Sequence, residues 1–349
     1  MRTPARAALS GLAVLSLASL ALTACTPSGG TAASGGGSCT PKDNITVGYI
    51  PKLGDDPYMT TVRDGAQKAA TELGGNNKVV YTSPSEATGA AQIPFVQQLI
   101  SQKVDVIAIS GSDLNGAAAE LKKAQAQGIK VITFDSDVAP DARSLFVNQA
   151  KTDELGTGML DSMSNLLDGK GEFAILSSTQ TAVNQNAWIA DIKKRLASET
   201  KFSGMKLVDV VYGEEKADVS ANRAKELVTT HPNLKGIIVP AGISLPAAAT
   251  ALDEIGALGK VKLTGLAPAS LIKKQIQTGN VQDIWWNVTD LGYLSFYAAK
   301  AAASCTVTGK AGEKFDAGKL GSYTVGDEKT VILGPAKIVT TANVNEFAF

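Results

Sequence analysis

The stretch VDVIAIS, residues 104–110, is apolar at five of its seven positions, with no alternation of apolar and polar residues between positions 106 and 109. A strand with one face in water alternates, whereas a strand of a parallel sheet is covered by helices on both faces and reads as a continuous apolar run. The stretch therefore predicts a buried strand of a parallel sheet. A second run of this kind, KVITF, follows at residues 130–134.

Short apolar runs alternate with amphipathic helical stretches on both sides of these two strands. Strands are expected at residues 45–50, 78–82, 104–110 and 130–134, and again at 172–177, 206–212, 236–239, 261–266 and 281–285. Helices are expected at residues 58–73, 92–102 and 116–127, and again at 186–197, 220–230, 245–255 and 270–277. This order predicts an α/β protein with two doubly wound parallel-sheet lobes. The alternative is a single barrel of eight units, but residues 137–156 interrupt the alternation between two complete sets and favour two lobes.

The first 24 residues have the pattern of an export signal. Arg2 and Arg6 precede a short apolar stretch, residues 7–22, which is too short for a membrane span. The sequence LTAC at residues 22–25 resembles a bacterial lipobox and implies a lipid on Cys25; the alternative is an ordinary secretory signal with a chance cysteine. Residues 25–42 are rich in Gly, Ser and Ala and predict a flexible tether. We therefore expect a body anchored by lipid to the extracytoplasmic face of the cell membrane.

Charge and cysteine content narrow the possible functions. Lys plus Arg and Asp plus Glu balance at 33 each, which argues against a nucleic-acid partner. The one histidine, His231, has no Cys/His cluster nearby, so we expect no metal, no cofactor and a surface turn at this position. In an exported protein Cys39 and Cys305 are candidates for a disulfide, and two free thiols are the alternative.

Polar and aromatic residues gather where the expected strands end. In open parallel sheets ligands bind outside the carboxyl ends of the strands. The residues at these ends that we expect to bind a ligand are Lys52, Asp56, Tyr58, Asp135, Asn184, Gln185, Pro240, Gly242, Trp286 and Asn287. The sequence has no Ser-His-Asp or Cys-His arrangement and no GxxxxGK[ST] or GxGxxG motif, so we expect no enzyme activity. Carboxylates, amides and an ammonium group suit the hydroxyls of a sugar, and aromatic rings suit its C–H face.

Structural roles also fit several of these residues. Asp56 directly precedes a proline at a helix start, so helix capping alone would explain it. Lys52 would also fit a solvated loop, and Asn184 and Gln185 would fit a loop before a helix. Neighbouring strand positions face opposite sides of a sheet, so at least one of residues 285 and 286, both tryptophan, is expected in the core. For Asp137 a structural role, orienting the crossover, is the alternative to ligand binding.

Long stretches of the chain resemble the sugar-binding proteins of bacterial ABC importers in the ribose-binding superfamily, which have the periplasmic binding protein type I fold. The resemblance lies in GYIPKLGDDPYMTTVRDGAQKAATELG (48–74), GIKVITFDSDVAPDARSLFVNQ (128–149), FAILSSTQTAVNQNAW (173–188) and WWNVTDLGYLSFYAA (285–299). It is greatest with the rhamnose-binding and autoinducer-2-binding branch.

This resemblance implies ligand contacts at particular positions, namely Lys52, Asp135, Asn184, Gln185, Pro240 and Gly242. Autoinducer-2 binders of this branch carry aspartate where this chain has Asn184, and alanine where it has Gly242. Ribose-type binders carry an arginine around residues 184–186, where this chain has none. The resemblance therefore favours rhamnose or a related sugar over autoinducer-2 and ribose.

The resemblance also implies three crossings between discontinuous lobes. The first lobe is expected to hold residues 43–148 and 288–323, and the second lobe residues 149–287 and 324–349, with Asn148 and Asn287 at crossings. Closure of the lobes around a monosaccharide would deliver it to the permease and ATPase of an ABC importer. The alternative is a receptor for autoinducer-2 or another sugar-like signal that feeds a sensor or an importer. A monomer is expected, and Tyr58, Met59 and Trp286 are candidates to contact the methyl group of a 6-deoxy sugar.

Overall fold

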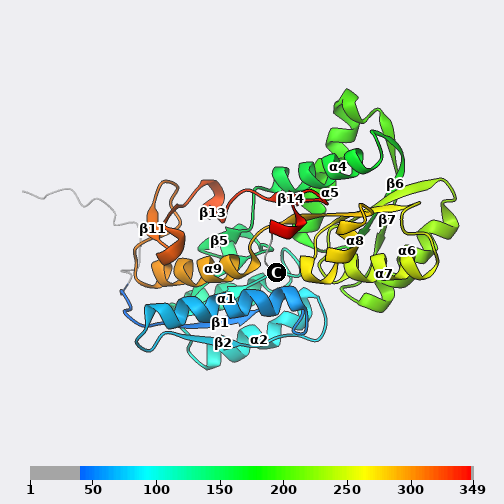
Figure 1. Ribbon diagram of the computed structural model, residues 1–349. Helices are drawn as coiled ribbons and strands as arrows, with labels where there is room; N and C mark the ends of the chain where they lie inside the picture. Colours follow the sequence, from blue (N-terminus) through cyan, green and yellow to red (C-terminus); the bar gives the residue numbers. More distant parts are fainter. Residues whose placement is uncertain (1–39, 347–349) are drawn as a thin grey trace, which may run out of the picture. The chain divides into compact units, whose positions relative to one another are not determined.

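A computed structural model describes residues 40–346 of the chain (Figure 1). The predicted export signal, most of the tether, Cys25 and Cys39 lie outside these residues. Within residues 40–346, no helix combines the length and the apolar character needed to cross a membrane.

The described residues form two six-stranded sheets and one small hairpin. In spatial order the first sheet contains β13 (Thr330–Ile332), β5 (Leu145–Asn148), β4 (Lys130–Phe134), β3 (Val106–Ile109), β1 (Thr46–Ile50) and β2 (Lys78–Tyr81). The second sheet contains β14 (Lys337–Val339), β10 (Val281–Trp285), β9 (Lys262–Gly265), β8 (Leu234–Val239), β6 (Lys170–Ser177) and β7 (Gly204–Tyr212). Within the two six-stranded sheets, all neighbouring strands are parallel except β10 and β14. The hairpin pairs β11 (Lys314–Asp316) with β12 (Ser322–Thr324).

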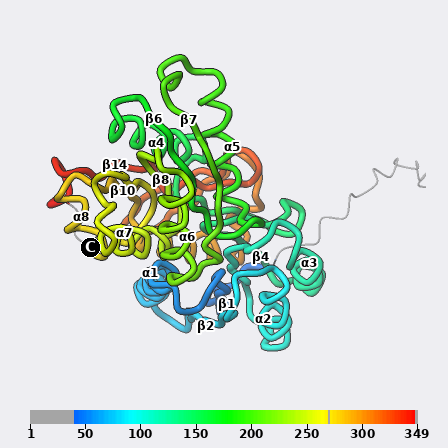
Figure 2. The backbone as a smooth tube through the Cα atoms, turned by 90° about the vertical axis from the view of Figure 1, so that its right-hand side faces the viewer, coloured from blue at the N-terminus to red at the C-terminus, as the bar shows by residue number. Residues whose placement is uncertain are grey.

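Helices cover both faces of each sheet. The first sheet carries α1 (Pro57–Leu73), α2 (Gly89–Ser101), α3 (Ala118–Ala126) and α9 (Val288–Ala303). The second sheet carries α4 (Thr152–Leu166), α5 (Val183–Ser198), α6 (Ala217–Thr230), α7 (Ser244–Glu254) and α8 (Lys273–Gln277). Figure 2 shows α1 and the pair α2 and α3 on opposite sides of β1, and each side has its own hydrophobic core. We call each sheet with its helices a lobe; the predicted α/β class with two doubly wound sheets is confirmed.

The apolar runs that predicted buried strands are buried as expected. All four residues of β3 are buried, as are the last four of β4. The sequence patterns missed β5, α4 and α9. Strand β5 has only four residues, and α4 contains Gly156 and Gly158, which lower helix propensity. Helix α9 is buried over most of its surface, so its sequence lacks the amphipathic pattern by which helices are recognised.

The chain passes between the lobes three times: after β5, between β10 and α9, and between β13 and β14. The third passage corrects the predicted boundary between residues 323 and 324, because β13 pairs with β5 of the first sheet and only β14 joins the second. Two contacts hold the segment around β13 on the first lobe. Val331 is fully buried in its core, and the buried Arg143 donates to the carbonyl of Glu328 at 2.6 Å.

Cys305 follows α9 and is disulfide-bonded. Its expected partner, Cys39, lies outside the described residues, so the pairing of these two cysteines stays a prediction.

Helices α1 and α9 lie side by side (Figure 1) and approach each other through glycine. A Cβ atom at Gly65 would overlap the carbonyl oxygen of Thr289, and one at Gly292 would overlap the carbonyl oxygen of Val62. The contact therefore depends on small residues from both helices.

We expect Gly65→Ala to lower the free energy of unfolding by about 1–3 kcal/mol, because the added methyl group forces the two helices apart. Gly158→Ala in α4 is the matched control, since a Cβ there meets its nearest neighbour, Ile284 Cδ1, at an ordinary 3.7 Å. The control is expected to stabilise by about 0.5–1 kcal/mol through helix propensity. Urea denaturation of both variants measures the difference, and equal effects would contradict the close packing of α1 on α9.

Candidate ligand-binding site

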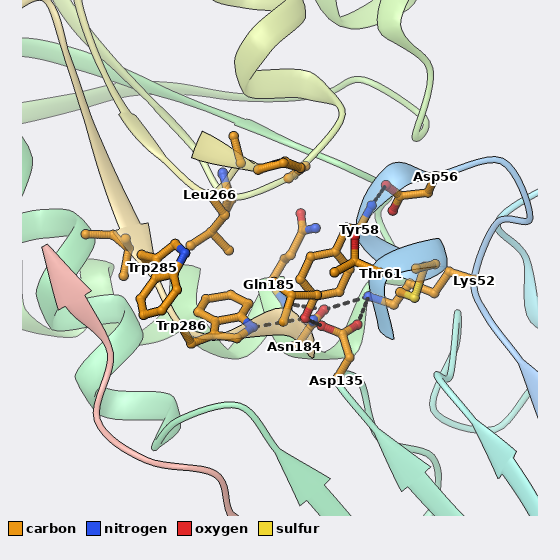
Figure 3. A pocket seen from close by; sticks show the side chains of 18 of the residues that line it. Lys52, Asp56, Tyr58, Thr61, Asp135, Asn184, Gln185, Leu266, Trp285 and Trp286 are labelled. Carbon is orange, nitrogen blue, oxygen red and sulfur yellow. Dashed lines mark hydrogen bonds and ion pairs between the residues drawn. The ribbon is translucent and has the colours of Figure 1, made fainter. Parts of the chain in front are cut away.

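A cavity of about 200 Å³ lies between the lobes, where strands of both sheets end (Figure 3). Its walls include all ten residues expected from the sequence to bind a ligand. From the first lobe and the crossing come Lys52, Asp56, Tyr58, Asp135, Trp286 and Asn287, and from the second come Asn184, Gln185, Pro240 and Gly242. The structure thus brings the predicted residues together, and their contact with a ligand stays a prediction.

Lys52 connects the two lobes inside this cavity. Its side chain is 7% exposed, and its Nζ lies 3.5 Å from Asp135 Oδ2 of the same lobe. The same Nζ donates to Asn184 Oδ1 of the other lobe at 3.0 Å. A buried ammonium group is costly unless it is paired and hydrogen-bonded, and here its partners come from both lobes.

Asp135 follows β4 and is held in an unusual backbone conformation. Its φ of 60° lies in the left-handed region, which costs a non-glycine residue about 1–2 kcal/mol. Its Oδ2 accepts a hydrogen bond from Ser110 Oγ at 2.9 Å, and its Oδ1 accepts one from Tyr58 Oη at 3.0 Å. Strained residues that are fixed by their surroundings cluster at binding sites, so this conformation supports a functional role for Asp135.

Tyr58 and Trp286 form an aromatic pair next to this carboxylate. The rings meet edge to face, with centroids 6.0 Å apart and planes at 84°. Trp286 Nε1 donates to Tyr58 Oη at 3.2 Å, and the tyrosine hydroxyl in turn donates to Asp135. Burial raises the pKa of Tyr58 well above its ordinary value, and the charge of Asp135 adds to the shift. The phenol therefore remains a hydrogen-bond donor.

Asn184 and Gln185 stand at the start of α5 with fixed orientations. Gln185 Oε1 accepts hydrogen bonds from Ser177 Oγ at 2.7 Å and from the backbone N–H of Ser178 at 2.8 Å. Its NH₂ group is left to donate toward the cavity, which it lines while 4% exposed. Both residues line the cavity, and their contact with a ligand stays a prediction.

Asp56 is a helix cap and also a residue of the cavity wall. It caps α1 by accepting from the backbone N–H of Tyr58 at 2.9 Å, and it also lines the cavity. Burial raises the pKa of Asp56 to about 7, and the charge of Glu215 adds to the shift. At neutral pH its carboxyl group is therefore partly protonated.

Sequence reasoning missed Glu215 and most of the apolar wall. Glu215 follows β7, so the rule of strand ends would have found it had that strand been included. The apolar part of the wall adds Trp188, Leu266, Ile284, Trp285 and Val288. Both residues 285 and 286 line the cavity. Trp286 is buried and belongs to a core cluster of the second lobe, which confirms the expectation of at least one core residue, and Trp285 packs against the other core cluster of that lobe.

Two residues considered from the sequence, Asp137 and His231, have structural contacts away from this cavity. Asp137 forms a salt bridge of 2.6 Å with the buried Arg143 and so orients the chain after β4. His231 ends α6 and lies 3.3 Å from Asp209 Oδ2. Within the described part of the chain, no group of His, Cys, Asp and Glu is arranged to hold a metal ion.

The cavity is chemically two-sided. One side presents carboxylates, amides and an ammonium group, and the other presents aromatic and aliphatic side chains. Its volume is below the roughly 300–1,000 Å³ typical of pockets for drug-sized ligands. Two lobes around a small cavity of this kind define a solute-binding protein.

Comparison with known proteins places the chain in a family. The model of the periplasmic binding protein domain family matches residues 47–309, and the chain belongs to this family.

Solved structures of similar proteins contain small polar ligands. The chain is 31% identical to an ABC transporter solute-binding protein from Clostridium phytofermentas with bound L-rhamnose, covering 87% of this chain and 98% of that one, with a TM-score of 0.83. It is 26% identical to LsrB from Clostridium saccharobutylicum in complex with AI-2, covering 87% and 100% of the two chains, with a TM-score of 0.81.

The chain is also similar to a bacterial sugar-binding protein. The chain is 25% identical over 241 residues to a D-ribose/D-allose-binding protein of Pseudomonas aeruginosa, covering 67% of this chain and 74% of the relative. These similar proteins include a solute-binding protein of an ABC transporter with bound L-rhamnose and a D-ribose/D-allose-binding protein, and this chain shares the periplasmic binding protein domain. Proteins of this kind bind solutes and are not enzymes.

The raised pKa of Asp56 predicts a pH-dependent stability. In the unfolded chain this carboxyl group has its ordinary pKa of 3.8, whereas in the fold its pKa is about 7. The folded state therefore holds the proton more tightly, and the stability that this provides is fully present below pH 3.8 and is lost as the pH rises to about 7. We therefore expect the melting temperature to fall between about pH 5 and pH 7.5 by at least about 2 °C, given that 1 kcal/mol corresponds to a few degrees.

Asp56→Asn should flatten this profile, because asparagine also caps helices and does not titrate. Asp55→Asn, at an exposed neighbouring position, is the control and should keep the slope of the wild type. Parallel profiles for all three proteins would show that Asp56 has an ordinary pKa.

Proposed function

We propose that this protein binds a neutral monosaccharide, with L-rhamnose or a related 6-deoxy sugar as the first choice, and delivers it to the permease and ATPase of an ABC importer. The observation that carries the proposal is the contact of Lys52 with Asp135 of its own lobe and with Asn184 of the other. Sugar hydroxyls donate and accept hydrogen bonds, so they match this set of carboxylate, amide and ammonium groups.

The apolar wall supports a deoxy sugar. Tyr58, Met59 and Trp286 line the cavity together, and the rings of Tyr58 and Trp286 lie next to the carboxylate of Asp135. A methyl group in place of a hydroxyl would lie favourably against such side chains, at about 0.8 kcal/mol for each buried carbon. The similar protein with bound L-rhamnose also supports a 6-deoxy sugar as the ligand.

Two competing ligands are disfavoured by residues in the cavity wall. Asn184 and Gly242 both line the cavity, and the family resemblance implies aspartate and alanine at these positions in autoinducer-2 binders. The arginine of ribose-type binders is absent from residues 184–186. The AI-2 complex and the ribose-binding relative among similar proteins nevertheless make both compounds necessary members of a binding test.

Closure of the cleft is the proposed mechanism. In addition to the Lys52–Asn184 bond, Thr181 Oγ1 of the second lobe donates to the carbonyl of Ser112 in the first at 3.3 Å. A sugar that bonds to both lobes adds contacts that exist only when the lobes are together, and so shifts the population toward the closed form. We propose that the permease recognises this form.

The lipid on Cys25 is part of the proposal, although this residue lies outside the described part of the chain. A lipid anchor followed by the tether of residues 25–42 would keep the binding lobes near the permease and raise their effective concentration there. The second candidate function is a receptor whose closed form is recognised by a sensor. The similar protein in complex with AI-2 is the observation that supports this alternative.

A chain beginning at Thr26 should be heat-stabilised by its ligand. We expect L-rhamnose or a related sugar to raise the melting temperature, because a ligand that binds only the native state stabilises it by mass action. The panel should include D-ribose, D-allose, D-fucose, D-arabinose and autoinducer-2. No response to any sugar would contradict the proposal, and a response to autoinducer-2 alone would favour the receptor.

Asp135→Asn should weaken binding of the responding sugar by more than about 1.5 kcal/mol, the scale of a hydrogen bond to a charged group. Asparagine tolerates the left-handed backbone of this position, so the fold is retained. Asp55→Asn is the exposed control, and isothermal titration calorimetry measures both. Equal dissociation constants for Asp135→Asn and the wild type would remove Asp135 from the site.

A further inference from the structure

Glu215 lies in the loop between β7 and α6 and has no role in the function proposed so far. It is 8% exposed and lines the cavity, whereas its neighbour Glu214 is exposed. The loop is fixed to the end of β6, because the backbone N–H groups of Gly213 and Glu214 donate to the carbonyls of Ser177 and Ser178 at 2.8 and 2.7 Å. The same two serines hold Gln185, so Glu215 is positioned by the structure that positions a predicted ligand contact.

Asp56 lies in the same cavity wall and belongs to the opposite lobe. It is 9% exposed, and the negative charge of Glu215 is the second cause, after burial, that raises its pKa. Among the described residues neither carboxyl group forms an ion pair. The nearby Lys52 is already engaged by Asp135 and Asn184. Two buried carboxyl groups, one from each lobe, therefore lie in one cavity without a cation of their own.

Two carboxylates in a buried site disfavour each other's ionisation, and such pairs hold one proton between them. A pair in this state has one O–H donor and several acceptor oxygens. This combination matches a sugar hydroxyl, which both donates and accepts, and it is unfavourable for a ligand that carries its own carboxylate.

We propose that Glu215 contacts the ligand from the second lobe, while Asp56 lines the same cavity from the first, and that these two buried carboxyl groups without a cation of their own retain a proton when the lobes are closed around the sugar. The inference rests on the proposed function and adds a specificity-determining residue to it. The other titratable groups facing the pair are Lys52, Tyr58, Asp135 and, at the edge of the loop, Glu214. The positive charge of Lys52 opposes the proton on both carboxyl groups, and the negative charge of Asp135 favours it.

Closure then takes up a proton, since the two groups separate and ionise when the lobes open. Affinity for a neutral sugar should accordingly fall as pH rises from about 5.5 to about 7.5.

Isothermal titration calorimetry tests this inference with L-rhamnose, or with whichever monosaccharide of the panel binds most tightly. Glu215→Gln should weaken binding by about tenfold, and the adjacent Glu214→Gln should stay within about twofold because its side chain is exposed. Titrations near pH 7 in two buffers of different ionisation enthalpy measure the proton uptake directly. The wild type and Glu214→Gln should take up a proton on binding, and Glu215→Gln should take up much less.

Unchanged affinity of Glu215→Gln, or proton uptake equal to that of the wild type, would overturn the inference and leave the sugar-binding function intact. Absence of proton uptake by the wild type would also overturn it, without reliance on any variant. Failure of the wild type to bind any sugar would instead overturn the proposed function, and the inference with it.

Discussion

The buried ammonium group of Lys52 is the constraint on which the arrangement of the cleft depends. Removing a cation from water costs several kcal/mol unless partners replace its hydration. Asp135 supplies the opposite charge from the same lobe, and Asn184 supplies an amide oxygen from the other. Lys52 therefore has its full set of protein partners only when the lobes are together. The free energy of burying this one charge thus depends on the relative position of the two sheets.

The parallel sheets explain why these groups meet. All strands that carry predicted ligand contacts run toward the cleft, so the loops after them converge without a dedicated binding element. Helices on both faces bury the strands that precede these loops. The cavity therefore obtains its polar side from loops at strand ends and its apolar side from Tyr58, Trp188 and Trp286, which also belong to or pack against the cores.

The sequence predicted those features of the fold and of the site that depend on a single local pattern. Unbroken apolar runs predicted the central strands, and the rule of strand ends predicted ten residues that share one cavity. It was uninformative where contacts distant in sequence decide the outcome. The three residues of β13 have no feature that assigns them to a lobe, and their place follows from the buried Arg143. Glu214 and Glu215 both have positive φ angles although neither is glycine, and only Glu215 is buried, so the local sequence does not indicate which of the two faces the cavity.

The left-handed backbone at Asp135 has a consequence for how this protein would change over generations. Glycine adopts that conformation without strain, so a selection that rewards only heat resistance favours replacement of the aspartate. Proteins descended in this way would gain stability against unfolding and would lose the carboxylate at the centre of the cleft. Persistence of aspartate at this position would therefore record continued demand for the bound molecule rather than for the fold.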